Sequence, residues 1–233
     1  KVMNISPSNF SFLKALSENN NREWFTANKK TYEQAHENAI SVADALLAGL
    51  SKHDQITTPT GKKSLMRIYR DVRFSKDKSP YNPRWAGSFN RSKPALRGGY
   101  YFHIQPGGNT VVGGGFYQPN ADDIKLIRDH IAMDDEPLKK VISDPKFIKT
   151  FGGLQGEQLK TAPKGFEKDH PSIDLLRYKS MYVFKSFSDK EVTSPDFVEN
   201  AVATFLALRP FFDVMTDYLT TDLNGISLIE NQA

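Results

Sequence analysis

The fold of this chain is decided by one central stretch, Tyr100-Tyr101-Phe102-His103-Ile104-Gln105-Pro106-Gly107-Gly108-Asn109-Thr110-Val111-Val112. Its first five residues predict a strand with Tyr100, Phe102 and Ile104 on one face and Tyr101 and His103 on the other. The Pro106–Asn109 segment then marks a hairpin turn, and a second strand-like run follows it. Because so short a connection joins antiparallel strands, this stretch predicts a small, mainly antiparallel sheet.

Outside this stretch, sequence periodicity predicts further strands and several helices. Short runs rich in aliphatic and aromatic residues predict strands at Leu65–Tyr69, Trp85–Phe89 and Met181–Phe187. Apolar residues at helical spacing predict a short helix around residues 10–16 and a long one from Asn21, as N-cap, to Leu50. Later helices are expected at residues 122–131, 138–142 and 175–176, and from Ser194-Pro195 through a bend at Pro210 to Tyr218.

These elements indicate an α+β fold in which a mainly antiparallel sheet packs against one long N-terminal helix and C-terminal helices. No repeat or linker divides the chain, so we expect residues 1–233 to form a single domain. Hydrophobic residues make up 39% and aromatic residues 12% of the chain, which is enough for a sizeable core.

Composition excludes several classes of site and location. The absence of cysteine excludes disulfides, a thiol nucleophile and a cysteine zinc site. The five histidines lack metal-ligand spacing, so neither a metal nor a cofactor is expected. No apolar run is long enough to cross a bilayer, and the start shows no signal-peptide pattern. We therefore expect a cytoplasmic protein without a membrane partner.

Positive charge is concentrated in one segment, Lys62–Arg97. It contains eleven Lys and Arg against Asp71 and Asp77, a net charge of +9 in a chain of +4, so the remainder carries −5. Such segregation predicts a surface that faces anions. The alternative is that these cations bind no ligand and only make one face of a sheet hydrophilic.

The densest chemistry lies within this segment, from Arg67 to Tyr81. We expect Arg67, Arg70, Arg73 and Lys78 to bind a phosphate- or carboxylate-bearing ligand. Asp71 would orient an arginine, and Tyr81 would donate a hydrogen bond. Catalysis would need a proton-transfer group, for which the candidates are His103 and Asp77.

This stretch resembles a bacterial family known as domain-of-unknown-function family 2461. The family pattern R-x-x-R-D-x-R-F-x-x-x-[DN]-K-x-x-Y falls on Arg67, Arg70, Asp71, Arg73, Phe74, Asp77, Lys78 and Tyr81. Further similarity lies at residues 20–25, 99–101, 159–160 and 163–166, so the resemblance spans nearly the whole chain. It implies no activity, ligand or catalytic residue.

Two other functions remain open from the residues alone. Aromatic residues between the cations, such as Tyr69, Phe74 and Trp85, are also typical of a nucleic-acid-binding module. Alternatively, the arginines and aspartates form an internal ion-pair network in a non-catalytic interaction scaffold. A small-ligand site needs cations that converge, whereas nucleic acid needs a continuous exposed stripe.

Overall fold

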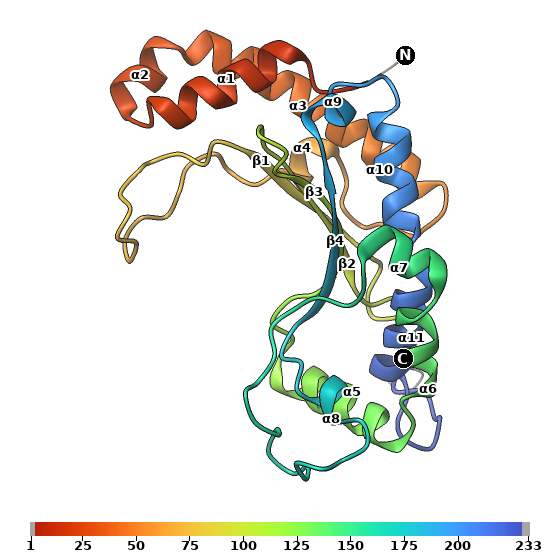
Figure 1. The fold of residues 1–233 in the computed structure, drawn as a ribbon. Helices are drawn as coiled ribbons and strands as arrows, with labels where there is room; N and C mark the ends of the chain where they lie inside the picture. Colours follow the sequence, from red (N-terminus) through yellow and green to blue (C-terminus); the bar gives the residue numbers. More distant parts are fainter. Residues whose placement is uncertain (1–2, 230–233) are drawn as a thin grey trace. The chain divides into compact units, whose positions relative to one another are not determined.

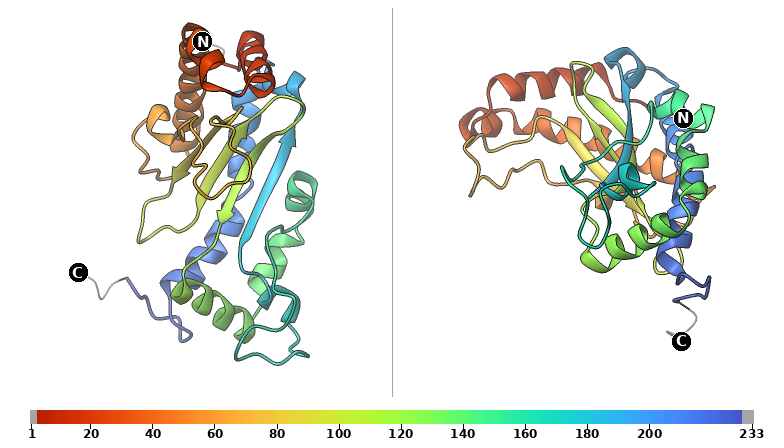
Figure 2. Two further views of the ribbon diagram at one scale, coloured as in Figure 1. Left: turned by 90° about the vertical axis from the view of Figure 1, so that its left-hand side faces the viewer. Right: turned by 60° about the horizontal axis from the view of Figure 1, so that its bottom comes forward.

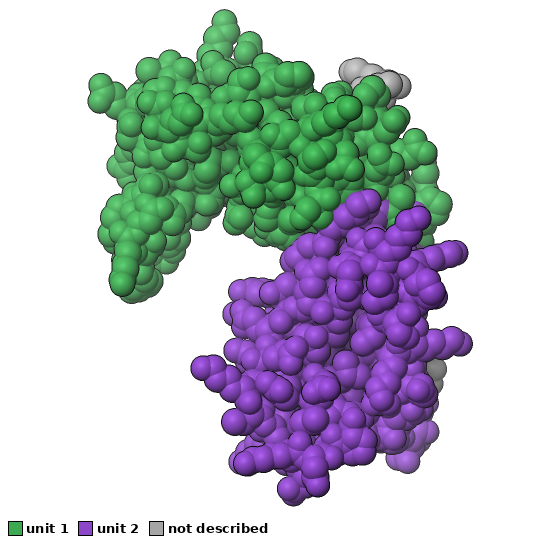
Figure 3. Space-filling model, in the orientation of Figure 1, with its two compact units in different colours: residues 1–89, 101–112, 186–203 green, residues 90–100, 113–185, 204–233 purple. Residues whose placement is uncertain are grey.

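The computed structural model describes residues 3–229 and confirms the predicted α+β fold. The chain groups into two compact units, which Figure 3 shows in different colours. Unit 1 comprises residues 1–89, 101–112 and 186–203, and unit 2 comprises residues 90–100, 113–185 and 204–233. The single domain expected from the sequence stays a prediction.

The sheet has four antiparallel strands in the order β1-β2-β3-β4. Their bounds are β1 Trp85–Asn90, β2 Gly99–Ile104, β3 Thr110–Phe116 and β4 Met181–Phe187 (Figure 1). The predicted hairpin between β2 and β3 is confirmed, and β2 alternates between buried and half-buried residues as expected. The strand predicted at Leu65–Tyr69 is wrong, because only two isolated bridges form there, Leu65 to Gly87 and Tyr69 to Tyr81. Pro80 and Pro83 on the opposite side have no N–H to extend that ladder.

Helices lie together at the N-terminal end of unit 1 (Figures 1 and 2). They are α1 Pro7–Glu18, α2 Arg22–Ala27, α3 Lys29–Ser51 and the short α4 Gly61–Ser64. Asn21 caps α2 as predicted, since its side chain accepts a hydrogen bond from Trp24 N. The single long helix expected from Asn21 to Leu50 is wrong, because Asn28 ends α2. Its amide side chain bonds Trp24 O at 2.9 Å, which competes with helical continuation.

The core of unit 1 is aromatic and joins α1 to the sheet. The buried Trp85 of β1 donates its indole N–H to Asn9 of α1 at 2.7 Å and stacks near Phe12. Asn9 is buried too, and its amide donates to Ala35 O at 2.9 Å. In the same core, Phe89 of β1 stacks on Phe102 of β2 with ring centroids 5.5 Å apart. This packing fixes the inner face of β1 and β2, and therefore which residues the outer face carries.

Most of the remaining helices belong to unit 2. They are α5 Ala121–Met133, α6 Glu136–Ile142, α7 Pro145–Phe151, α8 Ile173–Leu176 and α11 Arg209–Thr220, while α9 Asp189–Val192 lies in unit 1. The sequence did not predict α7, although Asp144 caps it and Pro145 stands in its first turn. In the described residues, no helix is long and apolar enough to cross a membrane.

The closing helix differs from its prediction in two ways. It begins at Phe197, as α10 Phe197–Leu206, because Ser194 and Pro195 form a turn in which the Ser194 hydroxyl accepts from Asp196 N. It is then interrupted before α11, whose first turn contains Pro210, so the expected bend is a break between two helices.

Candidate functional site

The residues of the Arg67–Tyr81 motif form a projecting loop of unit 1, residues 66–82, which we call the arm. The arm is the long gold loop that precedes β1 in Figure 1. Its two sides are joined by few backbone hydrogen bonds, including Arg70 N to Pro80 O at 2.9 Å and Asn82 N to Ile68 O at 2.7 Å. With so short a ladder, side-chain contacts must hold the rest of the arm in place.

Arg70 is one of these internal contacts. Its guanidinium donates to Asp77 Oδ2 at 2.7 Å and to the Ser79 carbonyl at 3.0 Å, and its side chain is 24% exposed. Asp77 also accepts hydrogen bonds from the Ser79 hydroxyl and N–H. These bonds from Ser79, followed by that from Arg70, lower the pKa of Asp77 to about 2. Asp77 is therefore ionised near neutral pH, and this low pKa disfavours it as a proton-transfer group.

Two of the other three motif cations expected to bind a ligand, Arg73 and Lys78, also have internal partners. Asp71 does hold an arginine, since Arg73 donates to its carboxylate from Nε at 3.0 Å and from Nη2 at 2.7 Å. This pair is mostly in solvent, and the hydrogen bonds from Arg73 lower the pKa of Asp71. Lys78 donates to the Val72 carbonyl at 2.9 Å. Three of the four predicted ligand-binding cations thus stabilise the arm.

Tyr81 is placed at the base of the arm and is 3% exposed. Its ring stacks on Phe25 with centroids 4.1 Å apart. The Asn20 side chain binds both the carbonyl and the N–H of Tyr81, at 2.9 and 3.1 Å. The contacts of Tyr81 with Phe25 and Asn20 anchor the arm to the helices of unit 1. Burial raises the pKa of the Tyr81 hydroxyl.

Within the part of the basic segment that lies in unit 1, two arginines have no such partner among the described residues. In the described residues, neither Arg67 nor Arg84 makes a side-chain hydrogen bond or ion pair. Arg67 is exposed on the arm, and Arg84 is half-buried just before β1. Sequence reasoning counted Arg84 among the basic residues but did not place it at the site.

Irregular pairing explains the position of Arg84. The two bridges Leu65–Gly87 and Tyr69–Tyr81 are four positions apart on the segment 65–69 but six positions apart on the facing segment 81–87. The two extra residues form a bulge that includes Pro83, and a bulge redirects the side chains beside it. Pro83 is the feature of the sequence that indicates this irregularity, because proline has no N–H to donate to a β-ladder.

On the outer face of β2, Tyr101 and His103 form a hydrogen-bonded chain. His103 Nε2 lies 2.9 Å from the Asn109 carbonyl, and His103 Nδ1 lies 3.1 Å from the Tyr101 hydroxyl. Because a carbonyl only accepts, Nε2 carries the proton and Nδ1 accepts from Tyr101. The structure therefore assigns one tautomer to the neutral ring.

Arg84 acts electrostatically on both residues of this chain. Burial lowers the pKa of His103, the charge of Arg84 lowers it further, and the bond to the Asn109 carbonyl opposes both. Burial raises the pKa of Tyr101, and Arg84 opposes that rise. The outer face of β2 thus presents a neutral imidazole and a phenol close enough to Arg84 to feel its charge, and the described residues provide no partner for Arg84. We call Arg84, Tyr101 and His103 the outer-face cluster.

The comparison with protein families covers both this cluster and the arm. A family model described as "Conserved hypothetical protein (DUF2461)" matches residues 8–214. The chain belongs to this family. The match confirms the resemblance seen in the Arg67–Tyr81 motif. Neither a curated protein nor a solved structure matches the chain.

In this DUF2461 chain the basic segment is not one continuous surface. Its last part lies in unit 2, where Arg91 is 1% exposed, donates to the Arg97 carbonyl at 2.8 Å and lies over the Phe212 ring. Arg97 pairs with Asp123. These two arginines therefore contribute to the packing of unit 2 rather than to an anion-facing surface.

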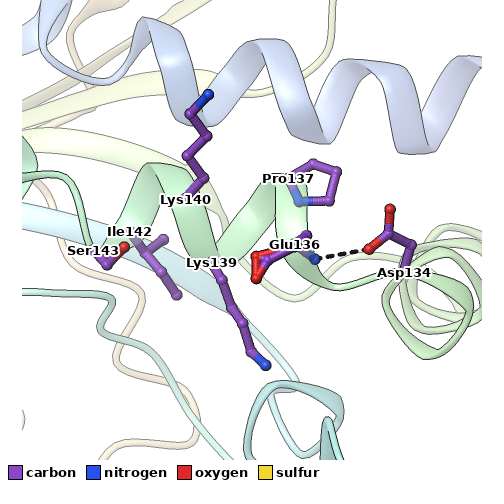
Figure 4. Close-up of a pocket in the computed structure, with 7 residues that line it drawn as sticks. All are labelled: Asp134, Glu136, Pro137, Lys139, Lys140, Ile142 and Ser143. Carbon is purple, nitrogen blue, oxygen red and sulfur yellow. Dashed lines mark hydrogen bonds between the residues drawn. The ribbon is translucent and has the colours of Figure 1, made fainter.

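Surface hollows elsewhere in the chain contain few features of a site. Figure 4 shows one in unit 2, lined by Asp134, Glu136, Pro137, Lys139, Lys140, Ile142 and Ser143. Its two lysines extend in different directions, and Lys139 is paired with Asp135 at 2.8 Å. Among residues 3–229 no group of three or more His, Asp or Glu is placed to hold a metal ion.

Proposed function

We propose that unit 1 binds a phosphate- or carboxylate-bearing ligand at the outer-face cluster, with Arg84 as its principal anion contact. The observation that carries this proposal is that Arg84 is half-buried yet has no internal partner among the described residues. By contrast, Arg70 and Arg73 already bind carboxylates. A shielded guanidinium without a counter-ion can donate two parallel hydrogen bonds to a phosphate or a carboxylate.

The neighbours of Arg84 suit the same ligand. His103 is neutral because its pKa is lowered, so it adds no competing charge. Tyr101 donates its hydroxyl hydrogen to His103, and burial raises its pKa, so the phenol stays neutral and adds no competing charge either. Arg67 lies on the segment that forms bridges with the residues before and within β1, and it supplies a second cation for which the described part of the chain provides no partner.

Calorimetric titration with inorganic phosphate, and with citrate as a carboxylate, tests this proposal. We expect Arg84→Ala to weaken binding at least about tenfold, since a charge-assisted hydrogen bond contributes about 1.5–3 kcal/mol. Arg67→Ala should weaken it less. Arg22→Ala, at an exposed arginine of α2, is the matched control and should bind like the unmodified protein. Equal affinity of Arg84→Ala and the unmodified protein would remove the proposal.

A second candidate function is the binding of single-stranded nucleic acid by the arm. Phe74 is 96% exposed, and the arm around it carries five cations against two aspartates. An exposed ring between cations provides base stacking together with phosphate contacts. The Arg70–Asp77 and Arg73–Asp71 pairs reduce the free charge of this surface, so we rank this function second.

Fluorescence anisotropy with a labelled oligothymidine separates this second function from the first. Binding should weaken steeply with salt because phosphate contacts release counter-ions. Phe74→Ala should remove about 1–3 kcal/mol of stacking. Tyr117→Ala, at a ring that is 67% exposed in unit 2, is the control. No binding at low salt, or equal loss in both variants, counts against the arm as a nucleic-acid surface.

A further inference from the structure

A second hollow of unit 2 lies where α5, α6 and α11 meet the turn that follows α11, and we call it the α11 hollow. Its volume is about 260 Å³. Met133 of α5 and Leu223 of the turn are exposed apolar side chains in its lining, and Val214 of α11 adds a third. The buried rings of His130 and Tyr218 also line it and stack with centroids 5.1 Å apart. The hollow therefore presents apolar surface to a ligand of about one ring with a short chain.

Hydrogen bonds within unit 2 fix the shape of the α11 hollow. His130 Nε2 lies 2.9 Å from the Thr221 carbonyl, and because a carbonyl only accepts, the imidazole donates this bond. In the turn after α11, Asp222 Oδ1 accepts from Asn224 N and from Ile226 N, each at 2.9 Å. The end of α11 and the turn are therefore held to α5 and to each other before any ligand binds.

The charges in the lining of the α11 hollow are acidic. Asp217 and Asp222 line it, and no lysine or arginine of the described chain does. Asp222 already accepts the hydrogen bonds of the turn, whereas the carboxylate of Asp217 is exposed and has neither a hydrogen-bond donor nor an ion-pair partner among residues 3–229. Burial, followed by the charge of Asp134, raises the pKa of Tyr218 to about 12, and Asp217 contributes to this rise. The phenol is therefore neutral, and the local potential favours a cation.

We propose that the α11 hollow binds a small organic ammonium ion, with its apolar body against Met133, Val214 and Leu223 and its N–H groups toward Asp217. An ammonium group on an apolar body matches both properties of the lining, its apolar walls and its unpaired carboxylate. The same carboxylates repel phosphates and carboxylic acids. This site belongs to unit 2 and does not depend on the proposed anion site of unit 1.

Methionine-methyl NMR of the full chain, titrated with the 2-phenylethylammonium ion, tests the proposal. The methyl signal of Met133 should shift and saturate at millimolar ligand. Met66 is the internal control and should not respond, since it is 53% exposed on the arm and Met133 is 58% exposed. The neutral analogue 2-phenylethanol should bind about two- to fivefold more weakly, because it lacks the contribution of an ion pair at an exposed carboxylate.

Substitutions in the lining separate the carboxylate from the apolar walls. Asp217→Asn should weaken binding of the ammonium ion about two- to fivefold and leave binding of the alcohol unchanged. Leu223→Ala should weaken binding of both ligands to the same extent, because both lose the same apolar contact. Asp213→Asn is the matched control, since Asp213 is an exposed aspartate of α11 outside the lining of the hollow.

Three results would overturn the proposal. One is the absence of a saturable shift at Met133, or an equal shift at Met66, which would show that no specific site exists. Another is equal affinity for the ammonium ion and the alcohol, which would show that the hollow does not recognise charge. The third is equal weakening in Asp217→Asn and Asp213→Asn, which would leave only a general attraction of the acidic surface. Calorimetry with phosphate tests the Arg84 site separately, so each proposal can fail without the other.

Discussion

Arg70 and Asp77 face each other across the arm, with Arg70 Nη1 2.7 Å from Asp77 Oδ2. They are seven positions apart in the chain, and the same guanidinium also donates to the Ser79 carbonyl. Asp77 in turn accepts two hydrogen bonds from Ser79. The two side chains therefore close the loop of the arm, which assigns them a structural role.

Loss of the Arg70–Asp77 contact should make the arm more mobile but lower the stability of the whole protein only slightly. Since the pair is partly exposed, we expect Arg70→Ala to lower the melting temperature by only about 2–4 °C. Limited proteolysis within residues 70–79 should become faster, because that segment loses its cross-link. Lys63→Ala, at an exposed lysine of α4, is the control. Unchanged proteolysis of Arg70→Ala would contradict the structural role.

Acid should remove the contribution of Asp77 to stability. The pKa of Asp77 in the folded protein is about 2, below its ordinary value of 3.8. A lowered folded-state pKa stabilises the fold above the unfolded-state pKa, and this contribution is lost as the pH falls towards 2. Urea unfolding of the unmodified protein and Asp77→Asn should therefore differ at pH 6 and converge near pH 2. A difference that is independent of pH would rule out this ionisation.

Truncation of Phe74 and truncation of Phe102 should change the free energy of unfolding by very different amounts. Phe74 is 96% exposed, so Phe74→Ala should change the free energy of unfolding by less than about 0.5 kcal/mol. Phe102 is 1% exposed and packs on Phe89, so Phe102→Ala should cost about 3–5 kcal/mol. Chemical denaturation measures both. A large loss of stability in Phe74→Ala would show that the tip of the arm is packed.

Gly113 and Gly108 should differ in their tolerance of a side chain. A Cβ at Gly113 would lie 1.9 Å from the Val183 carbonyl oxygen, so Gly113→Ala must displace β3 from β4. Gly108 has φ of +74° with open space around it, so Gly108→Ala meets only backbone strain of about 1–2 kcal/mol. Yield and melting temperature compare the two. Equal stability of both variants would contradict the close approach of the strands.

Local sequence patterns predicted much of the fold. The alternation in Tyr100–Ile104 and the turn at Pro106–Asn109 depend on neighbours in the chain, and both are confirmed. The break at Asn28 was not predicted, since its side-chain bond to the Trp24 carbonyl interrupts an otherwise continuous helical pattern. His103 was singled out from its strand position, but its hydrogen-bond partners were not.

The sequence by itself determined the α+β class, the hairpin and the concentration of cations before β2, because each follows from composition or from short spacing. Only the tertiary structure decided which of those cations are free. Arg70 and Arg73 are neutralised within the arm, and Arg97 by Asp123, which is 26 residues away. Arg84 has no partner among residues 3–229, and its charge shifts the pKa values of Tyr101 and His103. A charge count cannot distinguish these cases, because ion pairing depends on side-chain distances that only the folded chain fixes.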